Sequence, residues 1–204
     1  MNVYKDTKVE LLDHPHRKQL LSTTKFAMIS RYDVNKNKKI TESDMKRLLT
    51  NLYNWGHYTP LRYLQVMFTV YAPIYSLEQI KRHTVGINVN QMSLRYNKEP
   101  LGVYIPFEEN TTAYNIIYDS TYKSFQEYNK LLKEGIKPEE ARAVLPTSTM
   151  SVMGITFNVE SFRHICKARI NKKAQPVTSD VILKMYNLTR NIFPFNLVEV
   201  EKWD

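Results

Sequence analysis

The sequence contains a single cysteine, Cys166, and this scarcity excludes an internal disulfide bond. A chain without disulfides is compatible with a reducing compartment, so we expect a cytoplasmic protein. Glycine is also scarce, with 5 residues among 204, and no low-complexity linker is visible. This length without a linker predicts one domain over residues 1–204.

Long apolar runs are missing as well. No stretch reaches the roughly 18 residues that a membrane-spanning helix needs. Residues 1–18 are largely polar and lack the apolar region of a secretory signal. We therefore expect no membrane partner.

Positive charge, in contrast, is in excess, with a net charge of +9. Such an excess favours anionic partners, which include nucleotides, phosphorylated cofactors and nucleic acid. The basic residues are spread along the chain, and no nucleic-acid-binding module is recognisable. We expect no nucleic-acid partner, although a basic nucleic-acid-binding protein is the alternative that charge and the 12% of aromatic residues would support.

Helical and strand-like segments alternate along the chain, a pattern that is typical of α/β or α+β folds. A capping box formed by Thr41 and Asp44 predicts a helix from residue 42. Residues 84–90 contain glycine and asparagine, and we expect a loop there. The predicted strands are Lys8–Leu12, Arg62–Ala72 and Ser151–Phe157. The other predicted helices are Arg17–Ser30, Ser76–Arg82, Thr111–Lys133, Pro138–Leu145, Val159–Arg169 and Pro176–Ile192. The last helix has an apolar face of Val181, Met185, Leu188 and Ile192.

One segment imitates a calcium-binding loop. Residues 33–44 place oxygen-bearing side chains at several ligand positions, but Lys38 occupies the position that needs glycine for the sharp turn. We therefore predict a polar loop and a helix cap there. His57 and His83 have no ligating partner at a useful spacing, so we expect no metal site. Cys166 could be a nucleophile, but its place on an apolar helix face predicts a core residue.

Four arginines could bind anions or carbonyl groups, because the guanidinium fork pairs well with phosphate and planar acceptors. They are Arg82, Arg95, Arg142 and Arg169. Ser93 adds a hydroxyl beside Arg95, as a phosphate site would use. Any one of these arginines taken alone is more often a solvated surface residue.

Residues 79–96, QIKRHTVGINVNQMSLRY, resemble the signature loop of the flavin-dependent thymidylate synthases. In that family the loop reads RHR, seven residues, serine, one residue, then arginine and tyrosine. Here Arg82-His83-Thr84 stands for the first triplet and Ser93 for the serine. The match departs from the family in two ways: Thr84 replaces an arginine, and the stretch from Arg82 to Ser93 is one residue longer.

Three further segments support the resemblance, which extends from about Gly56 to about Val181. Gly56-His57-Tyr58-Thr59-Pro60 is similar to the family's GHxTP segment, and Ala72-Pro73-Ile74 is similar to the segment before the signature loop. The stretch from Gly135 to Pro146 resembles the family's nucleotide-binding arginine segment. Four such matches in the family's order are not expected by chance.

The resemblance implies a single domain with a central mixed sheet flanked by helices, and a reaction that makes dTMP from dUMP. The carbon donor would be methylenetetrahydrofolate, and reducing equivalents would come from NADPH through FAD. It further implies a homotetramer with shared active sites. Residues implied to bind dUMP are Gln79, Gln91, Met92, Ser93, Leu94, Arg95, Arg142 and Arg169, and those implied to bind FAD are His57, Thr59, Arg82, His83, Thr84, Asn90, Asn158 and His164.

Among these residues, Arg169 is the implied catalytic group, because a guanidinium at a uracil carbonyl would stabilise negative charge that develops on the ring. No enzyme thiol is needed in this chemistry, in keeping with a core role for Cys166. Thr84 raises the alternative of an inactive or altered homologue that still binds flavin or nucleotide.

Overall fold

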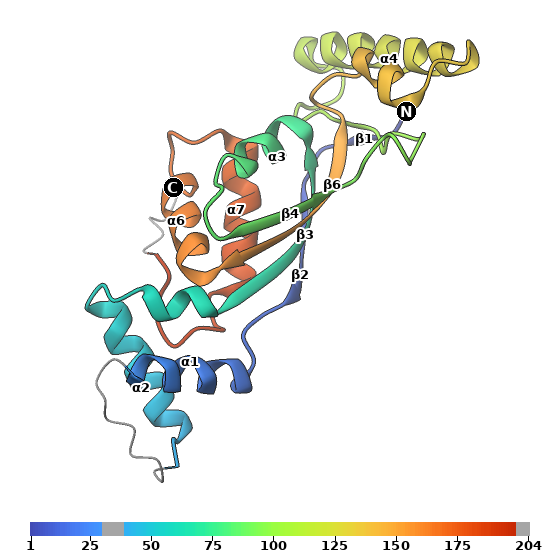
Figure 1. Ribbon diagram of the computed structural model, residues 1–204. Coiled ribbons are helices and arrows are strands. Elements are labelled where there is room, and N and C mark those ends of the chain that lie inside the picture. The colour runs from blue at the N-terminus through green and yellow to red at the C-terminus, as the bar shows by residue number, and fades with distance from the viewer. Residues whose placement is uncertain (30–38, 199–204) are drawn as a thin grey trace.

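The computed structural model describes residues 1–29 and 39–198, and a four-stranded sheet forms its centre (Figure 1). The strand order is β2-β3-β6-β4, and each neighbouring pair is antiparallel. The strands are β2 (Lys8–Asp13), β3 (Gln65–Pro73), β4 (Ile87–Gln91) and β6 (Met150–Asn158). The central strands β3 and β6 pair along their whole length, from Gln65 opposite Asn158 to Pro73 opposite Met150.

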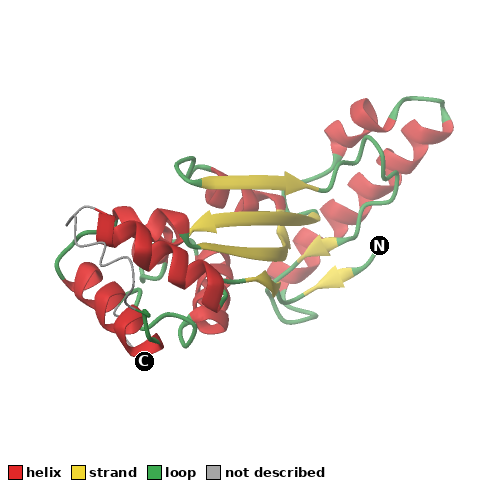
Figure 2. Ribbon diagram, turned by 60° about the horizontal axis from the view of Figure 1, so that its bottom comes forward, coloured by secondary structure: helices red, strands yellow, loops and turns green. Residues whose placement is uncertain are grey.

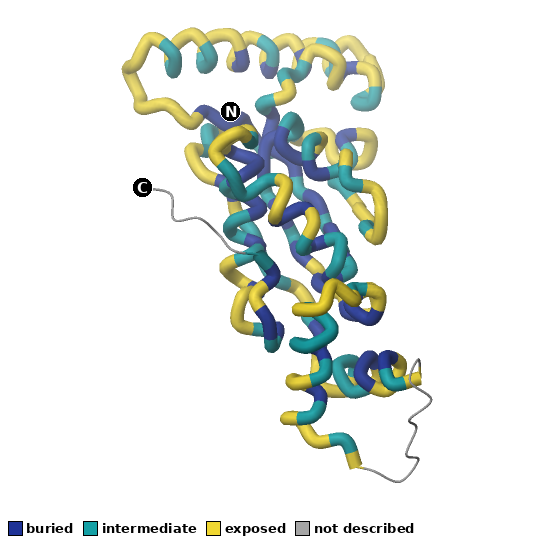
Figure 3. The backbone as a smooth tube through the Cα atoms, turned by 90° about the vertical axis from the view of Figure 1, so that its left-hand side faces the viewer, coloured by how far each residue is buried: buried dark blue, intermediate teal, exposed yellow. Residues whose placement is uncertain are grey.

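One face of the sheet is covered by helices α3 (Ile74–Lys81), α6 (Val159–Arg169) and α7 (Pro176–Thr189). Alternation along β3 and β6 directs every second side chain toward these helices. The resulting core contains Val66, Phe68 and Val70 from β3, Met153, Ile155 and Phe157 from β6, and Phe162, Ile165, Val181 and Met185 from α6 and α7. Figure 3 shows this buried centre and the exposed helices at both ends.

At one end of the sheet lie α1 (Arg17–Ile29), α2 (Glu42–Asn54) and the short 3-10 helix η1 (Thr59–Tyr63) (Figure 1). The predicted capping box is confirmed: the Thr41 hydroxyl accepts from Asp44 N at 3.2 Å, and the Asp44 carboxylate accepts from Thr41 N at 3.1 Å. Residues 33–38 of the segment that imitates a calcium loop lie outside the described residues, as does Ser30.

At the other end, the long helix α4 (Thr112–Lys133) stands away from the sheet (Figures 1 and 2). It is followed by α5 (Pro138–Ala141) and the 3-10 helix η2 (Arg142–Val144). Nearby, β1 (Val3–Tyr4) and β5 (Val103–Tyr104) form a separate parallel pair. The molecule is therefore elongated, with helical ends on both sides of the sheet.

The predicted α/β class is confirmed, with three differences. The central sheet is antiparallel instead of mixed, because the parallel pair β1–β5 lies outside it. Part of the predicted loop 84–90 is the edge strand β4, which pairs with β6 through contacts distant in sequence. Leu188, predicted on the buried face of α7, is 44% exposed, whereas Ile182 and Thr189 of that helix are buried.

Candidate active site

The loop between α3 and β4 binds to the first turn of α6. Gly86 turns with a φ of 67°, and its carbonyl accepts from Asn158 N at 2.9 Å. The Asn158 carboxamide oxygen caps α6 by accepting from Ser161 N at 2.8 Å. The Ser161 hydroxyl in turn donates to the Val85 carbonyl at 2.6 Å. Two hydrogen bonds, to the Gly86 and Val85 carbonyls, thus hold the longer loop on the terminus of α6, whose cap is Asn158.

Asn158, Ser161 and His164 are spaced three residues apart, so they lie along one side of α6, the side that this loop follows. The imidazole of His164 lies 5.9 Å from that of His83, centroid to centroid, with the rings tilted by 66°. Two of the predicted flavin residues, His83 and His164, are therefore neighbours. Asn158 joins them at the start of the helix.

At the other end of α6, Arg169 joins a predicted flavin residue to a predicted nucleotide residue. Its Nε donates to His83 Nε2 at 3.2 Å, and its Nη2 donates to the Gln79 carbonyl at 3.4 Å. A guanidinium has five N–H donors, so three of those of Arg169 have no partner among the described residues. These free donors can meet a carbonyl or phosphate oxygen.

His83 must be neutral in this arrangement, because a nitrogen that accepts from Arg169 carries no proton. Its environment favours that state. Partial burial, followed by the charges of Arg169 and His164, lowers the pKa of His83 below its ordinary value. The proton of neutral His83 then resides on Nδ1.

His57 lies two residues before η1 and Thr59 is its first residue, and both are exposed. The end of η1 is joined to the start of α6, since Val159 N donates to the Leu64 carbonyl at 2.9 Å. Arg62 of η1 and Glu160 of α6 form an ion pair beside this bond. The 3-10 helix that starts at Thr59 is therefore anchored at the Asn158 end of α6.

Gln91, at the end of β4, is held at both ends of its amide. Its Oε1 accepts from Lys81 Nζ at 3.0 Å, and its Nε2 donates to Ser151 Oγ at 3.2 Å. Lys81 also pairs with Glu78 one turn earlier on α3. This chain of contacts connects the helix that carries Gln79 to the strand that carries Gln91.

Two of the predicted phosphate-binding residues, Ser93 and Arg95, come shortly after Gln91 in the chain. The Ser93 hydroxyl accepts from Arg95 N at 3.2 Å, which leaves its own proton free for an acceptor. Arg95 and Arg142 converge on Glu139: the Arg95 Nε lies 3.9 Å from the Glu139 carboxylate, and the Arg142 Nε donates to the Glu139 carbonyl at 3.2 Å. Leu94, the residue before Arg95, is buried. Two exposed cations and a hydroxyl thus lie at the base of the α4 end.

The remaining predicted site residues have fewer interactions within the chain. Arg82, Thr84 and Asn90 are exposed, and Asn90 lies opposite Gly154 on the sheet edge. Met92 continues the edge, with its N–H donating to the Val152 carbonyl at 2.8 Å. Among the described residues, none of these side chains makes a hydrogen bond or an ion pair with another predicted flavin residue.

Four residues that position the site were missed from the sequence: Lys81, Ser151, Glu139 and Ser161. The spacing of Ser161, three residues after Asn158, is a helix-cap signal that could have indicated its place. Lys81 and Ser151 carry no such signal, because their contacts depend on the pairing of β4 with β6.

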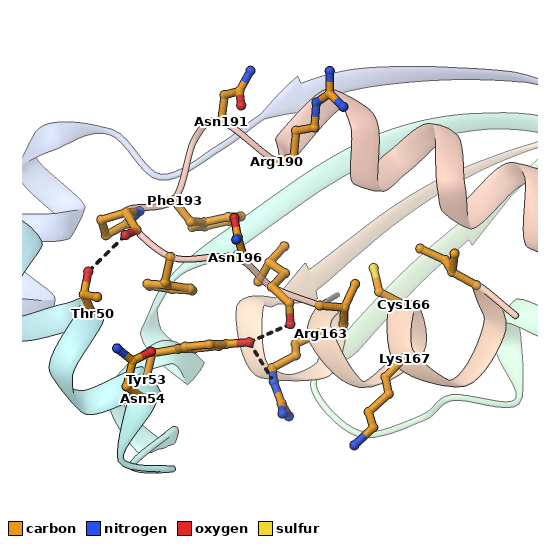
Figure 4. Close-up of a pocket in the computed structure, with 15 residues that line it drawn as sticks. Thr50, Tyr53, Asn54, Arg163, Cys166, Lys167, Arg190, Asn191, Phe193 and Asn196 are labelled. Atoms are coloured by element: carbon orange, nitrogen blue, oxygen red, sulfur yellow. Dashed lines mark hydrogen bonds between the residues drawn. The ribbon is translucent and has the colours of Figure 1, made fainter. Parts of the chain in front are cut away.

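A groove of about 970 Å³ lies elsewhere, between α2, α6 and residues 190–198 (Figure 4), and none of the predicted site residues lines it. Cys166 lies beside it and is fully buried; burial raises the pKa of its thiol strongly. The core interpretation of Cys166 agrees with this environment. Among residues 1–29 and 39–198, no group of three or more potential ligands could hold a metal ion, and no helix is long and apolar enough to span a membrane.

Comparison with known proteins identifies relatives of the chain. The family model described as thymidylate synthase complementing protein matches residues 10–195. A flavin-dependent thymidylate synthase of Thermosipho africanus is 29% identical over 185 residues, covering 81% of this chain and 80% of that protein. That of Thermotoga neapolitana is 30% identical over 154 residues, covering 72% and 70%.

A solved structure has the same fold. It is a UMP/dUMP methylase, PolB from Streptomyces cacaoi bound with 5-Br dUMP, with a TM-score of 0.80 over 95% of this chain and 94% of that one, at 22% identity. The sequence matches cover both ends of the candidate site, from His57 to Arg169. The chain therefore belongs to the thymidylate synthase complementing protein family and is a methyltransferase of the flavin-dependent thymidylate synthase type.

Proposed function

We propose that the chain makes dTMP from dUMP, with methylenetetrahydrofolate as carbon donor and NADPH as reductant through bound FAD. The observation that carries this proposal is the guanidinium of Arg169. Two of its N–H donors bind His83 and Gln79, and the other three have no partner among the described residues. PolB, which shares the fold, is a UMP/dUMP methylase bound with a brominated nucleotide. A pyrimidine nucleotide is therefore the substrate class that we assign.

The nucleotide would be held by two groups of residues. Arg95, Arg142 and the free Ser93 hydroxyl supply the charge and the donor that a phosphate needs. Near the base, two N–H donors of Arg169 can meet one uracil carbonyl, since its other contacts fix the guanidinium in place. Because those donors are oriented before the substrate binds, they stabilise negative charge developing on the ring oxygen without reorganising.

The residues along α6 fit a flavin. FAD carries an anionic pyrophosphate and a ring with several hydrogen-bond acceptors, and the exposed Arg82 has no ion pair to any described residue. Arg82, His83, Asn158 and His164 would hold it, with His57 and Thr59 at the Asn158 end. The bound flavin would supply the redox chemistry, while these side chains bind and orient it.

The orientation of Asn158 limits its part in this binding. Its oxygen already accepts from Ser161 N, whereas its amide nitrogen donates to no described residue and is the free group for a cofactor. We therefore assign Asn158 as a donor to flavin. Neutral His83 keeps one N–H, on Nδ1, for the same purpose.

We further propose a homotetramer in which copies of the chain complete one another's sites. Arg82, Thr84, Asn90, Arg95 and Arg142 are all exposed in the single chain, although ligands of this class bind in enclosed pockets. A closed symmetric assembly can bury such residues against a second copy.

Purified protein tests the proposal directly. A flavin absorbance band is expected, and incubation with dUMP, methylenetetrahydrofolate and NADPH should yield dTMP; a parallel reaction with UMP tests the sugar preference. Arg169→Ala should abolish turnover while flavin remains bound, a loss of about 10²-fold or more. Bound flavin with no product in the wild type would favour the inactive homologue that Thr84 suggests.

A further inference from the structure

We propose that Lys81 is a positioning residue that sets the orientation of the Gln91 amide, so that a free N–H of Gln91 faces the nucleotide. The inference rests on the proposed binding of dUMP by this site. It begins with the contact between Lys81 Nζ and Gln91 Oε1, at 3.0 Å, on a lysine side chain that is only 30% exposed.

A glutamine amide has two ends that differ in chemistry, and its neighbours decide which end points where. An ammonium group can only donate hydrogen bonds, so the orientation in which the Gln91 NH₂ faces Lys81 is unfavourable. The Ser151 hydroxyl can donate or accept, so it tolerates both orientations. The choice is therefore made by Lys81 and not by Ser151.

With Oε1 fixed toward Lys81, the amide nitrogen is fixed toward Ser151 at 3.2 Å. That nitrogen carries two hydrogens, and only one is used by a described residue. The second is a preorganised donor for an oxygen of the pyrimidine, sugar or phosphate. A reversed amide would present its oxygen to the substrate oxygen instead, which is repulsive.

Lys81 is itself held by Glu78, one turn earlier on α3, so its ammonium does not depend on the substrate for a partner. Ser151 is buried at 3% exposure and cannot easily move away. The four side chains form a continuous row from helix to strand. The substrate side of Gln91 is thus ordered before binding, which reduces the entropy cost of binding.

The test compares the FAD-loaded enzymes Lys81→Met, Lys81→Arg and Gln91→Ala, and the double variant Lys81→Met/Gln91→Ala. Lys46→Met is the matched control, because Lys46 also pairs with a glutamate on its own helix, Glu42, at 2.8 Å, but contacts no predicted substrate residue. Measurements are the Kd for dUMP by titration of the flavin spectrum, and kcat and KM for dTMP formation.

We expect Lys81→Met to raise Kd and KM for dUMP about tenfold, the loss of one oriented hydrogen bond, while kcat changes less than about twofold. Gln91→Ala should have a similar effect, and the double variant should add little to either. Lys81→Arg should recover most of the affinity, because arginine also only donates. Lys46→Met should bind dUMP like the wild type.

The inference is overturned if Lys81→Met binds dUMP as tightly as Lys46→Met, or if the Lys81 and Gln91 effects simply multiply in the double variant. Failure of the proposed function looks different: the wild type itself would then neither bind dUMP nor form dTMP. An unchanged melting temperature in Lys81→Met separates positioning from a general loss of structure.

Discussion

Gly86 determines whether the flavin-side loop can reach α6. Its φ of 67° lies in the left-handed region, and a Cβ added there would be 1.9 Å from the Asn158 amide nitrogen and 2.6 Å from the Ser161 hydroxyl. We predict that Gly86→Ala lowers the free energy of unfolding by about 1–3 kcal/mol and weakens retention of FAD, because Asn158 must leave its cap position. Urea denaturation and flavin release measure both effects.

Gly135→Ala provides the control for the backbone. Gly135 has a φ of 82°, but a Cβ there would meet no atom within 4 Å. The Gly135→Ala variant therefore has the backbone strain without the steric clash, and we expect it to retain flavin like the wild type. Equal flavin loss in both variants, or none in Gly86→Ala, would contradict the role assigned to this loop.

His83 connects pH to the Arg169 geometry. Its pKa is lowered by burial, then by Arg169 and His164, so the folded state stays neutral where the unfolded chain begins to bind a proton, near pH 6.5. The stabilisation from this depressed pKa is present above about pH 6.5 and is lost as the pH falls through the folded pKa. Below that pKa, protonated His83 can no longer accept from Arg169.

We therefore predict that kcat/KM for dUMP falls on the acid side of neutrality in the wild type. His83→Gln keeps a side-chain acceptor but cannot titrate, so its acid limb should be flatter, at a lower plateau of activity. Profiles of kcat/KM between about pH 5 and 8 test this. An identical acid limb in both proteins would assign the titration to another group.

At the scale of elements, Tyr53 joins α2 to α6 and to the C-terminal segment (Figure 4). Its hydroxyl donates to the Leu197 carbonyl at 2.6 Å and accepts from Arg163 Nε at 3.2 Å, while its ring stacks on Phe195 at 4.4 Å. Tyr53→Phe keeps the stacking and removes both hydrogen bonds. We expect a loss of about 1–2 kcal/mol in the free energy of unfolding, measured in urea.

Tyr186→Phe is the matched comparison, because among the described residues the Tyr186 hydroxyl makes one longer bond, 3.4 Å, to the Val198 carbonyl. That loss should be clearly smaller. Similar losses would indicate that the Tyr53 hydroxyl contributes little. Since α6 carries Asn158, His164 and Arg169, a destabilised Tyr53→Phe should also release flavin at a lower temperature.

Elements with strong local signals were predictable from the sequence. The cap at Thr41 fixes the start of α2, and the apolar positions Phe162 and Ile165 identify the buried face of α6. Strand β4 was not predictable, because its signal is the partner β6, some 60 residues away. The motif residues of the site could be chosen by resemblance, whereas Lys81 and Ser151, which meet through that pairing, could not.

At the scale of the whole molecule, the candidate nucleotide residues fall into two groups. Arg169 and Gln79 lie where α3 and α6 end, and Arg95 and Arg142 gather at Glu139 near α4. No hydrogen bond or ion pair between the described residues joins Arg169 to Arg142. In a homotetramer with shared sites, these groups would face each other across a subunit boundary.

Mixed oligomers distinguish sharing from separate sites. Arg142→Ala and Arg169→Ala chains, each inactive alone, would be produced together so that mixed tetramers form. If one active site takes Arg142 from one copy and Arg169 from another, random mixing leaves both arginines intact in about a quarter of the sites, and dTMP formation should return to about that fraction. If both arginines act within one chain, every site lacks either Arg142 or Arg169, and no activity returns. Chains of Arg142→Ala/Arg169→Ala mixed with wild type in the same ratio give the reference for tetramer exchange.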